Sequence, residues 1–184
     1  MRALSLTLAL IIIASLVFGQ SSVHTGLKLK EGSIDCYDQK SGKKIDFSDC
    51  LTFDLLAIGD SQTKVIALMG PIDQVVEQID TAQVAIYPLT PTHQDDDPYL
   101  IVTFKDSVVT TLLLQGRGTT EAFSFSGLTL GDDTTSVVKM LGKPDATVPH
   151  KGYDTTVWAY DGLPISIEIE NGKIFSIQIW KPSR

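Results

Sequence analysis

The chain has 184 residues and carries 22 acidic against 15 basic side chains, for a formal net charge of −7. An acidic chain without a basic stripe argues against partners such as nucleic acid or anionic membranes. Its length allows either two small units that share a core or one elongated domain.

The first residues have the pattern of an export signal. Arg2 precedes an uncharged apolar run over residues 3–18, and Val17 and Gly19 are suitable for the positions before a cleavage site at Gln20. The run is shorter than the roughly 20 residues of a membrane-spanning helix, which is the alternative interpretation. No cysteine near this site could carry a lipid. We therefore expect a signal peptide over residues 1–19 and a mature periplasmic or secreted chain that is not inserted in the membrane.

The only two cysteines, Cys36 and Cys50, follow this signal closely. Extracytoplasmic compartments are oxidising and favour disulfides. Ser41 and Gly42 form a turn signal between short β-like runs, which would bring the two sulfurs together across a hairpin. Free thiols or a metal pair are the alternatives, although two cysteines without a nearby histidine make a poor metal site. We predict a disulfide hairpin within an N-terminal extension over residues 20–50.

Two later segments, residues 56–73 and 128–145, have closely similar sequences. Identical pairs recur at one fixed spacing: Leu56/Leu128, Gly59/Gly131, Asp60/Asp132, Thr63/Thr135, Val65/Val137, Gly70/Gly142 and Asp73/Asp145. Such a recurrence is typical of a duplicated structural unit. It predicts a first repeat over residues 51–115 and a second over residues 122–181.

Each predicted repeat begins with a short amphipathic helix, over residues 61–69 and 133–141. Apolar residues at helical spacing share one face of each helix, and Gly70 and Gly142 provide the expected C-terminal stops. Nine residues is too short for a stable isolated helix, so each helix must pack on other elements.

Alternating apolar and polar residues follow each helix and predict strands with one buried face and one solvent-facing face. The strands are expected over residues 84–87, 99–104, 108–114, 156–160, 165–169 and 174–180. Asn171-Gly172 is a strong hairpin signal. The predicted fold class is α+β, with two tandem repeats, each a short helical element packed on a small antiparallel β-meander.

The second repeat resembles the BamE (SmpA/OmlA) family of small envelope proteins. The residues that carry this resemblance are Leu130-Gly131, Val137, Leu141-Gly142-Lys143-Pro144-Asp145, Trp158-Ala159-Tyr160 and Ile169-Glu170-Asn171-Gly172-Lys173-Ile174. Two such units in tandem are similar to the secreted β-lactamase inhibitor protein (BLIP) family. These resemblances imply helix-plus-sheet units and protein binding without catalytic machinery, and they name no individual partner.

An acidic insertion over residues 88–98 is the sharpest cluster of chemical groups. His93, Asp95, Asp96 and Asp97 could hold a divalent cation. Consecutive carboxylates lack the alternating ligand spacing of a calcium loop, so a solvated loop tip is the favoured interpretation and no metal site is predicted.

Catalytic patterns are weak in this chain. His24, His93 and His150 are scattered and have no adjacent nucleophile, and Ser124 and Ser126 lie in a β-like run rather than at a nucleophile elbow. No glycine-rich phosphate loop is present. We predict a non-enzymatic protein without a cofactor.

Aromatic residues are the remaining binding candidates. Tyr99, Tyr160 and Trp180 lie on predicted strands, and tyrosine and tryptophan are enriched at binding hot spots. They are equally suitable as core residues, and for Trp158 the core is favoured. Together with His93, Asp95, Asp96 and Asp97 of the insertion, they form the predicted protein-binding set.

The predicted function is an exported protein-binding module of the bacterial cell envelope, whose partner is another envelope or secreted protein. One alternative is an envelope-assembly or structural accessory protein, and another is an inhibitor of a secreted enzyme such as a β-lactamase. A small-ligand or metal-binding protein that uses the acidic insertion is a further alternative.

Overall fold

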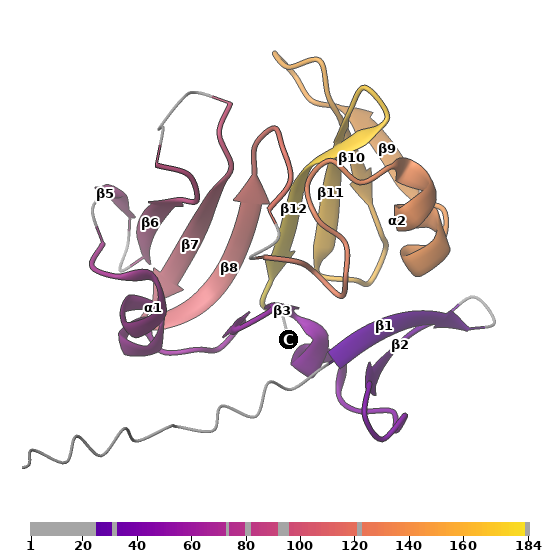
Figure 1. Ribbon diagram of the computed structural model, residues 1–184, viewed down its shortest axis with the longest axis horizontal. Coiled ribbons are helices and arrows are strands. Elements are labelled where there is room, and N and C mark those ends of the chain that lie inside the picture. The colour runs from indigo at the N-terminus through magenta and orange to yellow at the C-terminus, as the bar shows by residue number, and fades with distance from the viewer. Residues whose placement is uncertain are drawn as a thin grey trace, which may run out of the picture.

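The computed structural model describes residues 25–30, 33–72, 74–79, 82–91, 96–120 and 123–182. The predicted signal peptide lies outside these residues. The described part is mostly β and is built around one eight-stranded antiparallel sheet (Figure 1). Neither of its α-helices is long and apolar enough to cross a membrane.

The strands of the large sheet have the lateral order β5-β6-β7-β8-β12-β11-β10-β9. Their bounds are β5 (Gln74–Ile79), β6 (Ala82–Pro88), β7 (Tyr99–Lys105), β8 (Val108–Gln115), β9 (Ala146–Pro149), β10 (Thr156–Ala159), β11 (Ile165–Glu170) and β12 (Lys173–Trp180). The other elements are β1 (Thr25–Lys30), β2 (Ser33–Asp38), the 3-10 helix η1 (Phe47–Cys50), β3 (Thr52–Phe53), β4 (Leu56–Ala57), α1 (Gln62–Met69) and α2 (Thr134–Leu141).

The predicted fold class is wrong, although the predicted helices and strands are found close to their expected positions. β8 pairs with β12, with Leu112 opposite Ile179 and Leu114 opposite Ile177, so the strands of both segments form one sheet. An unpaired edge strand exposes a row of backbone donors and acceptors, and pairing β8 with β12 satisfies both rows. The result is one continuous sheet with two short helices, not two tandem helix-on-meander repeats.

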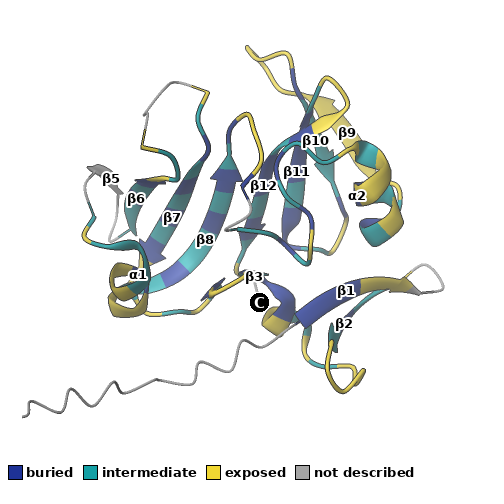
Figure 2. Ribbon diagram, in the orientation of Figure 1, coloured by how far each residue is buried: buried dark blue, intermediate teal, exposed yellow. Residues whose placement is uncertain are grey.

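The hydrophobic core covers one face of this sheet. Buried positions alternate with partly exposed ones along β7 and β8 (Figure 2). Leu100, Val102 and Phe104 of β7 point into the core with Phe53 and Phe125, whose rings meet edge to face at 6.2 Å. The α-helices contribute Val65, Val137 and Leu141 to the same core.

The helix ends follow the sequence signals closely. Ser61 Oγ accepts a hydrogen bond from the Lys64 amide at 3.2 Å and caps α1. Gly70 and Gly142 end the two helices with φ values of 89° and 80°, which confirms the predicted glycine stops. Asp133, at the corresponding start of α2, makes no capping hydrogen bond through its side chain.

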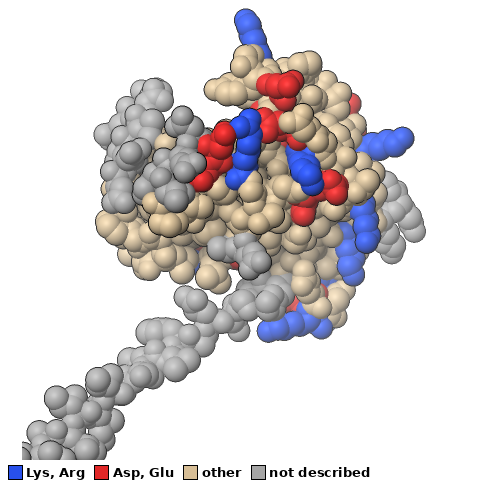
Figure 3. Space-filling model, turned by 45° about the horizontal axis from the view of Figure 1, so that its top comes forward, with Lys and Arg blue, Asp and Glu red and all other residues tan. Residues whose placement is uncertain are grey.

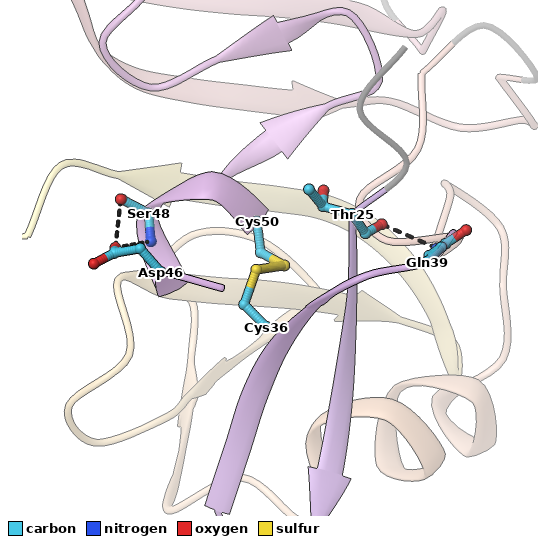
Figure 4. The surroundings of a disulfide bond; sticks show 6 residues. All are labelled: Thr25, Cys36, Gln39, Asp46, Ser48 and Cys50. Carbon is cyan, nitrogen blue, oxygen red and sulfur yellow. Dashed lines mark hydrogen bonds between the residues drawn. A yellow bond between two sulfur atoms is a disulfide. The ribbon is translucent and has the colours of Figure 1, made fainter. Parts of the chain in front are cut away.

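The predicted disulfide is confirmed and joins Cys36 of β2 to Cys50 of η1 (Figure 4). Their Cα atoms are 5.8 Å apart, and both side chains are buried. The predicted turn lies between them, since the Gly42 amide donates to Asp38 O at 2.8 Å. The partner strand of β2 is β1, so the N-terminal hairpin is larger than the cysteine loop alone.

Candidate functional site

The face of the large sheet opposite the core is partly exposed, and we call it the open face. Strand register identifies its members, because alternate side chains point to opposite faces. One lateral row runs through Ile86, Ile101, Leu113, Gln178 and Ser166, on five adjacent strands. The open face comprises Val84, Ile86, Tyr99, Ile101, Thr103, Thr111, Leu113, Gln115, Val157, Ser166, Gln178 and Trp180, all of them partly exposed.

The β6–β8 side of the open face is apolar at its centre. Ile86 lies opposite Ile101, and Ile101 lies opposite Leu113, so three aliphatic side chains are adjacent across three strands. Val84 adds a fourth in the next row. These four aliphatic side chains form a contiguous, partly exposed apolar patch.

Trp180 lies on the open face, at the end of β12 and opposite Thr111 of β8. Its side chain helps to line an open hollow of about 600 Å³. The residues around this hollow are Thr110, Thr111, Gln178, Trp180, Lys181 and Pro182. The indole is therefore accessible on the same surface as the aliphatic centre.

A polar cluster lies at another part of the open face, around Glu168 of β11. This side chain is almost buried, with 8% of its surface exposed. Its carboxylate accepts hydrogen bonds from His150 Nδ1, from the Thr155 hydroxyl and, at 3.1 Å, from the Ser176 hydroxyl. The carboxylate therefore ties the turn between β9 and β10 to the two strands β11 and β12.

Tyr153 lies in that turn, 66% exposed, with its ring centroid 4.7 Å from that of His150. Tyr99 belongs to the same lateral row as Glu168, through Gln115 and Ser176. Burial raises the pKa of Tyr99, and the charges of Tyr153 and Glu168 raise it further. In Figure 1 the hairpin of β9 and β10 extends past the end of the sheet and leans toward β8.

This cluster was not predicted from the sequence. In the sequence, His150 is an isolated loop residue and Glu168 is a polar position in an alternating strand. Because His150 lies in the β9–β10 turn and Glu168 lies on β11, no local spacing links them. The alternating pattern of β11 indicates only that Glu168 points to the face opposite the flanking isoleucines.

Tyr160, also predicted to bind a partner, lies on the core side and is 5% exposed. Its hydroxyl donates to Gly142 O at 3.4 Å. Burial, with a smaller contribution from Asp145, raises the pKa of Tyr160 to about 12. Trp158 packs against the core from β10, as favoured from the sequence.

The acidic insertion is described only in part, because His93 and Asp95 lie outside the described residues. Asp96 accepts from Arg117 at 2.6 Å, and Arg117 also donates two bonds of 2.8 Å to Glu170. These hydrogen bonds raise the pKa of Arg117 and lower that of Glu170.

Figure 3 shows acidic and basic side chains interspersed at this end of the sheet. Asp97 adjoins the same junction, since its carbonyl oxygen would lie 2.8 Å from a Cβ atom placed on Gly116. Within the described ranges, no three His, Cys, Asp or Glu side chains are grouped to hold a metal ion. Arg117 instead connects the described end of the insertion to β11.

No protein-family model and no curated protein match this chain. A cysteine-rich secretory protein of Staphylococcus aureus is similar in structure, with a TM-score of 0.44 and 15% identity, over 67% of this chain and 44% of that one. A DUF4309 family protein of Bacillus subtilis has a TM-score of 0.44 and 14% identity, over 77% and 89%. An extracellular protein of Bacillus anthracis that contains an SCP domain has a TM-score of 0.47 and 12% identity, over 74% and 47%.

The chain thus spans less than half the length of the S. aureus and B. anthracis proteins. The comparisons show no relationship to BamE or to the β-lactamase inhibitor protein, so that predicted resemblance is wrong. Its motif at residues 141–145 has a local explanation, because Gly142 ends α2 and Asp145 accepts from the Asp161 amide at 2.8 Å.

Proposed function

We propose that this chain is an exported, non-enzymatic binding module that docks on another envelope or secreted protein through the open face. One observation carries the proposal: the open face continues across the β8–β12 junction and presents aliphatic and aromatic side chains that are partly exposed. Large partly exposed apolar surfaces on soluble domains mark interaction sites.

The face is a better docking surface than the β9 edge of the sheet. β9 has four residues, all exposed, and ends at Pro149, which has no amide hydrogen to donate. A short edge strand that contains proline is a poor template for an added strand. Side-chain contacts on the face therefore provide the affinity in this proposal.

The buried disulfide supports the exported location, because such bonds persist in oxidising compartments outside the cytoplasm. The proposal places the protein in the periplasm or outside the cell. The predicted signal peptide agrees with this location.

A binding role fits the chemistry of the open face better than catalysis does. The His150–Glu168 pair has the form of a base with its orienting carboxylate. A hydrolase would also need a nucleophile at the second ring nitrogen, and in the described residues the side chain that bonds to His150 is Glu168. We assign the pair a positioning role for the β9–β10 turn.

The proposal is tested with two charge-introducing variants. Ile101→Glu places a carboxylate at the aliphatic centre of the open face. Ile66→Glu is the matched control, because Ile66 is 39% exposed and lies on α1, outside the sheet. Partners are first captured from the envelope and medium of the source organism and identified, and their affinity is then measured by calorimetry.

The expected result is a defined extracytoplasmic partner whose affinity falls at least about tenfold with Ile101→Glu, because the new charge must be desolvated. Ile66→Glu should bind like the wild type. Equal binding by the wild type and a folded Ile101→Glu protein would show that the open face is not the docking surface.

A further inference from the structure

We infer that one end of the open face receives the ammonium group of a lysine side chain presented by the protein partner. This inference rests on the proposed function and adds the chemistry of one contact. The receiving site consists of Tyr99, His150, Tyr153 and Glu168, and we call it the aromatic corner.

The aromatic corner combines aromatic rings with a nearby carboxylate. Tyr153 is mostly exposed, and Tyr99 is partly exposed on the open face. Glu168 lies in the same lateral row as Tyr99 and is bonded to His150, whose ring contacts Tyr153. Aromatic faces carry negative electrostatic potential and attract cations within about 6 Å of the ring centroid.

The basic side chain of the β9–β10 turn is Lys151, which is exposed and lies over no aromatic ring of the described residues. Within the described chain, the ion-pair partner of Glu168 is His150, with no lysine or arginine. The cation that lies over an aromatic ring in the described residues is Lys28, which is 5.6 Å from the Tyr37 ring centroid in the N-terminal hairpin. No lysine or arginine of the described chain therefore covers the rings of the aromatic corner.

The whole chain also favours a cation, because a net charge of −7 attracts cations over the Debye length of about 8–10 Å. A basic partner would therefore be steered toward this protein, and steering of this kind weakens as ionic strength rises.

The hydrogen bonds of Glu168 favour an ammonium over a guanidinium. One carboxylate oxygen accepts from His150 and Thr155, and the other accepts from Ser176. A guanidinium gains its advantage from bidentate bonding to both oxygens of a carboxylate, and the three existing hydrogen bonds leave about one of the four lone-pair positions for a new donor. A lysine ammonium is a compact charge that can lie over the rings without displacing the existing bonds.

The test uses the full mature chain and two small probes. One is Nα-acetyl-lysine N-methylamide, and the other is the same molecule acetylated on its side-chain nitrogen, which removes the charge and keeps the aliphatic chain. Binding is followed by NMR through the ring signals of Tyr99 and Tyr153. The charged probe should shift these signals in a saturable way, and the acetylated probe should bind at least about fivefold more weakly.

Variants separate the contributions of the site. Tyr153→Ala should weaken the charged probe, whereas Tyr153→Phe should retain it, because the ring face persists. Tyr153 is exposed, so these variants are not expected to affect folding. Glu168→Gln should weaken the charged probe and leave the acetylated probe unchanged. Equal binding of both probes, or no saturable shift, would overturn the inference.

Phosphatidylcholine vesicles distinguish a lipid source of the ammonium group. Co-sedimentation with vesicles that depends on Tyr153, without a response to the lysine probe, would also overturn the inference. Failure of the inference about the aromatic corner can be distinguished from failure of the proposed function. A partner that is lost with Ile101→Glu but retained with Tyr153→Ala would refute the aromatic corner alone.

Discussion

Replacement of Gly142 by alanine should destabilise the protein through two separable effects. The first is backbone strain, because Gly142 has φ 80° and ψ −170°, a region that residues with a Cβ atom avoid. This effect costs about 1–3 kcal/mol. The second is a contact, because the new Cβ would lie 3.3 Å from Leu29 Cδ2 and 3.7 Å from Leu29 Cδ1.

Gly70 is the matched control for the backbone effect. Its φ and ψ are 89° and −177°, close to those of Gly142, but a Cβ atom added to Gly70 would meet no described heavy atom within 4 Å beyond its immediate chain neighbours. Gly70→Ala should therefore show the strain alone. Moving Leu29 away from a preferred rotamer adds about 0.5–1.5 kcal/mol to the cost of Gly142→Ala.

The free energy of unfolding is measured by urea denaturation of the wild type and both variants, and thermal unfolding provides a second reading. Each kcal/mol corresponds to about 2–4 °C in Tm for a chain of this size. Leu29→Ala, combined with Gly142→Ala, should recover the additional cost, because Leu29 is 43% exposed and can be truncated cheaply.

Two results would refute this reasoning. Equal costs for Gly142→Ala and Gly70→Ala, with an additive double variant, would show that β1 does not pack on the end of α2. An unchanged free energy of unfolding for Gly142→Ala would show that the helix ends elsewhere.

Three further predictions concern other parts of the chain. Replacing Cys36 and Cys50 by serine should lower the free energy of unfolding by about 3 kcal/mol, because they close a loop with a sequence separation of 14, and an unchanged urea midpoint would contradict this. Arg117→Met should raise the lowered pKa of Glu170 in an NMR titration. The stabilisation from that lowered pKa is present above the unfolded-state pKa and is lost as pH falls through the folded-state pKa. In Arg117→Met, the free energy of unfolding should therefore fall less steeply as the pH is lowered through this range. Tyr160, whose pKa is raised to about 12, should ionise at a higher pH than an ordinary tyrosine in a near-ultraviolet titration. Its contribution to the free energy of unfolding is complete below the unfolded-state pKa of about 10 and should be lost as pH rises through the folded-state pKa.

Local elements of this fold were predictable because their signals are local. The glycine stops at Gly70 and Gly142 and the Asn171-Gly172 turn each act within a few residues, and the structure has these features where the sequence indicates them. The lateral joining of β8 to β12 was not predictable in the same way. It depends on two strands far apart in the chain, and repetition of a local pattern says nothing about whether two sheets remain separate.

The predicted aromatic binding residues lie on different faces of the sheet, and the sequence could not predict which face each one would occupy. Alternation placed Tyr99 and Trp180 on strands but could not decide which sheet face would be covered. Tyr160 lies just beyond β10, where its ring enters the core beside the end of α2. The outcome for each aromatic residue depends on tertiary packing, which a single sequence encodes only indirectly.

The aromatic corner depends directly on the joining of β8 to β12. Tyr99 belongs to β7 and Glu168 to β11, and the row that connects them passes through Gln115 of β8 and Ser176 of β12. If the two meanders formed separate sheets, this row would be interrupted between Gln115 and Ser176. The fold therefore does more than add the areas of two small sheets, because their junction places Tyr99 of one half and Glu168 of the other in one continuous row.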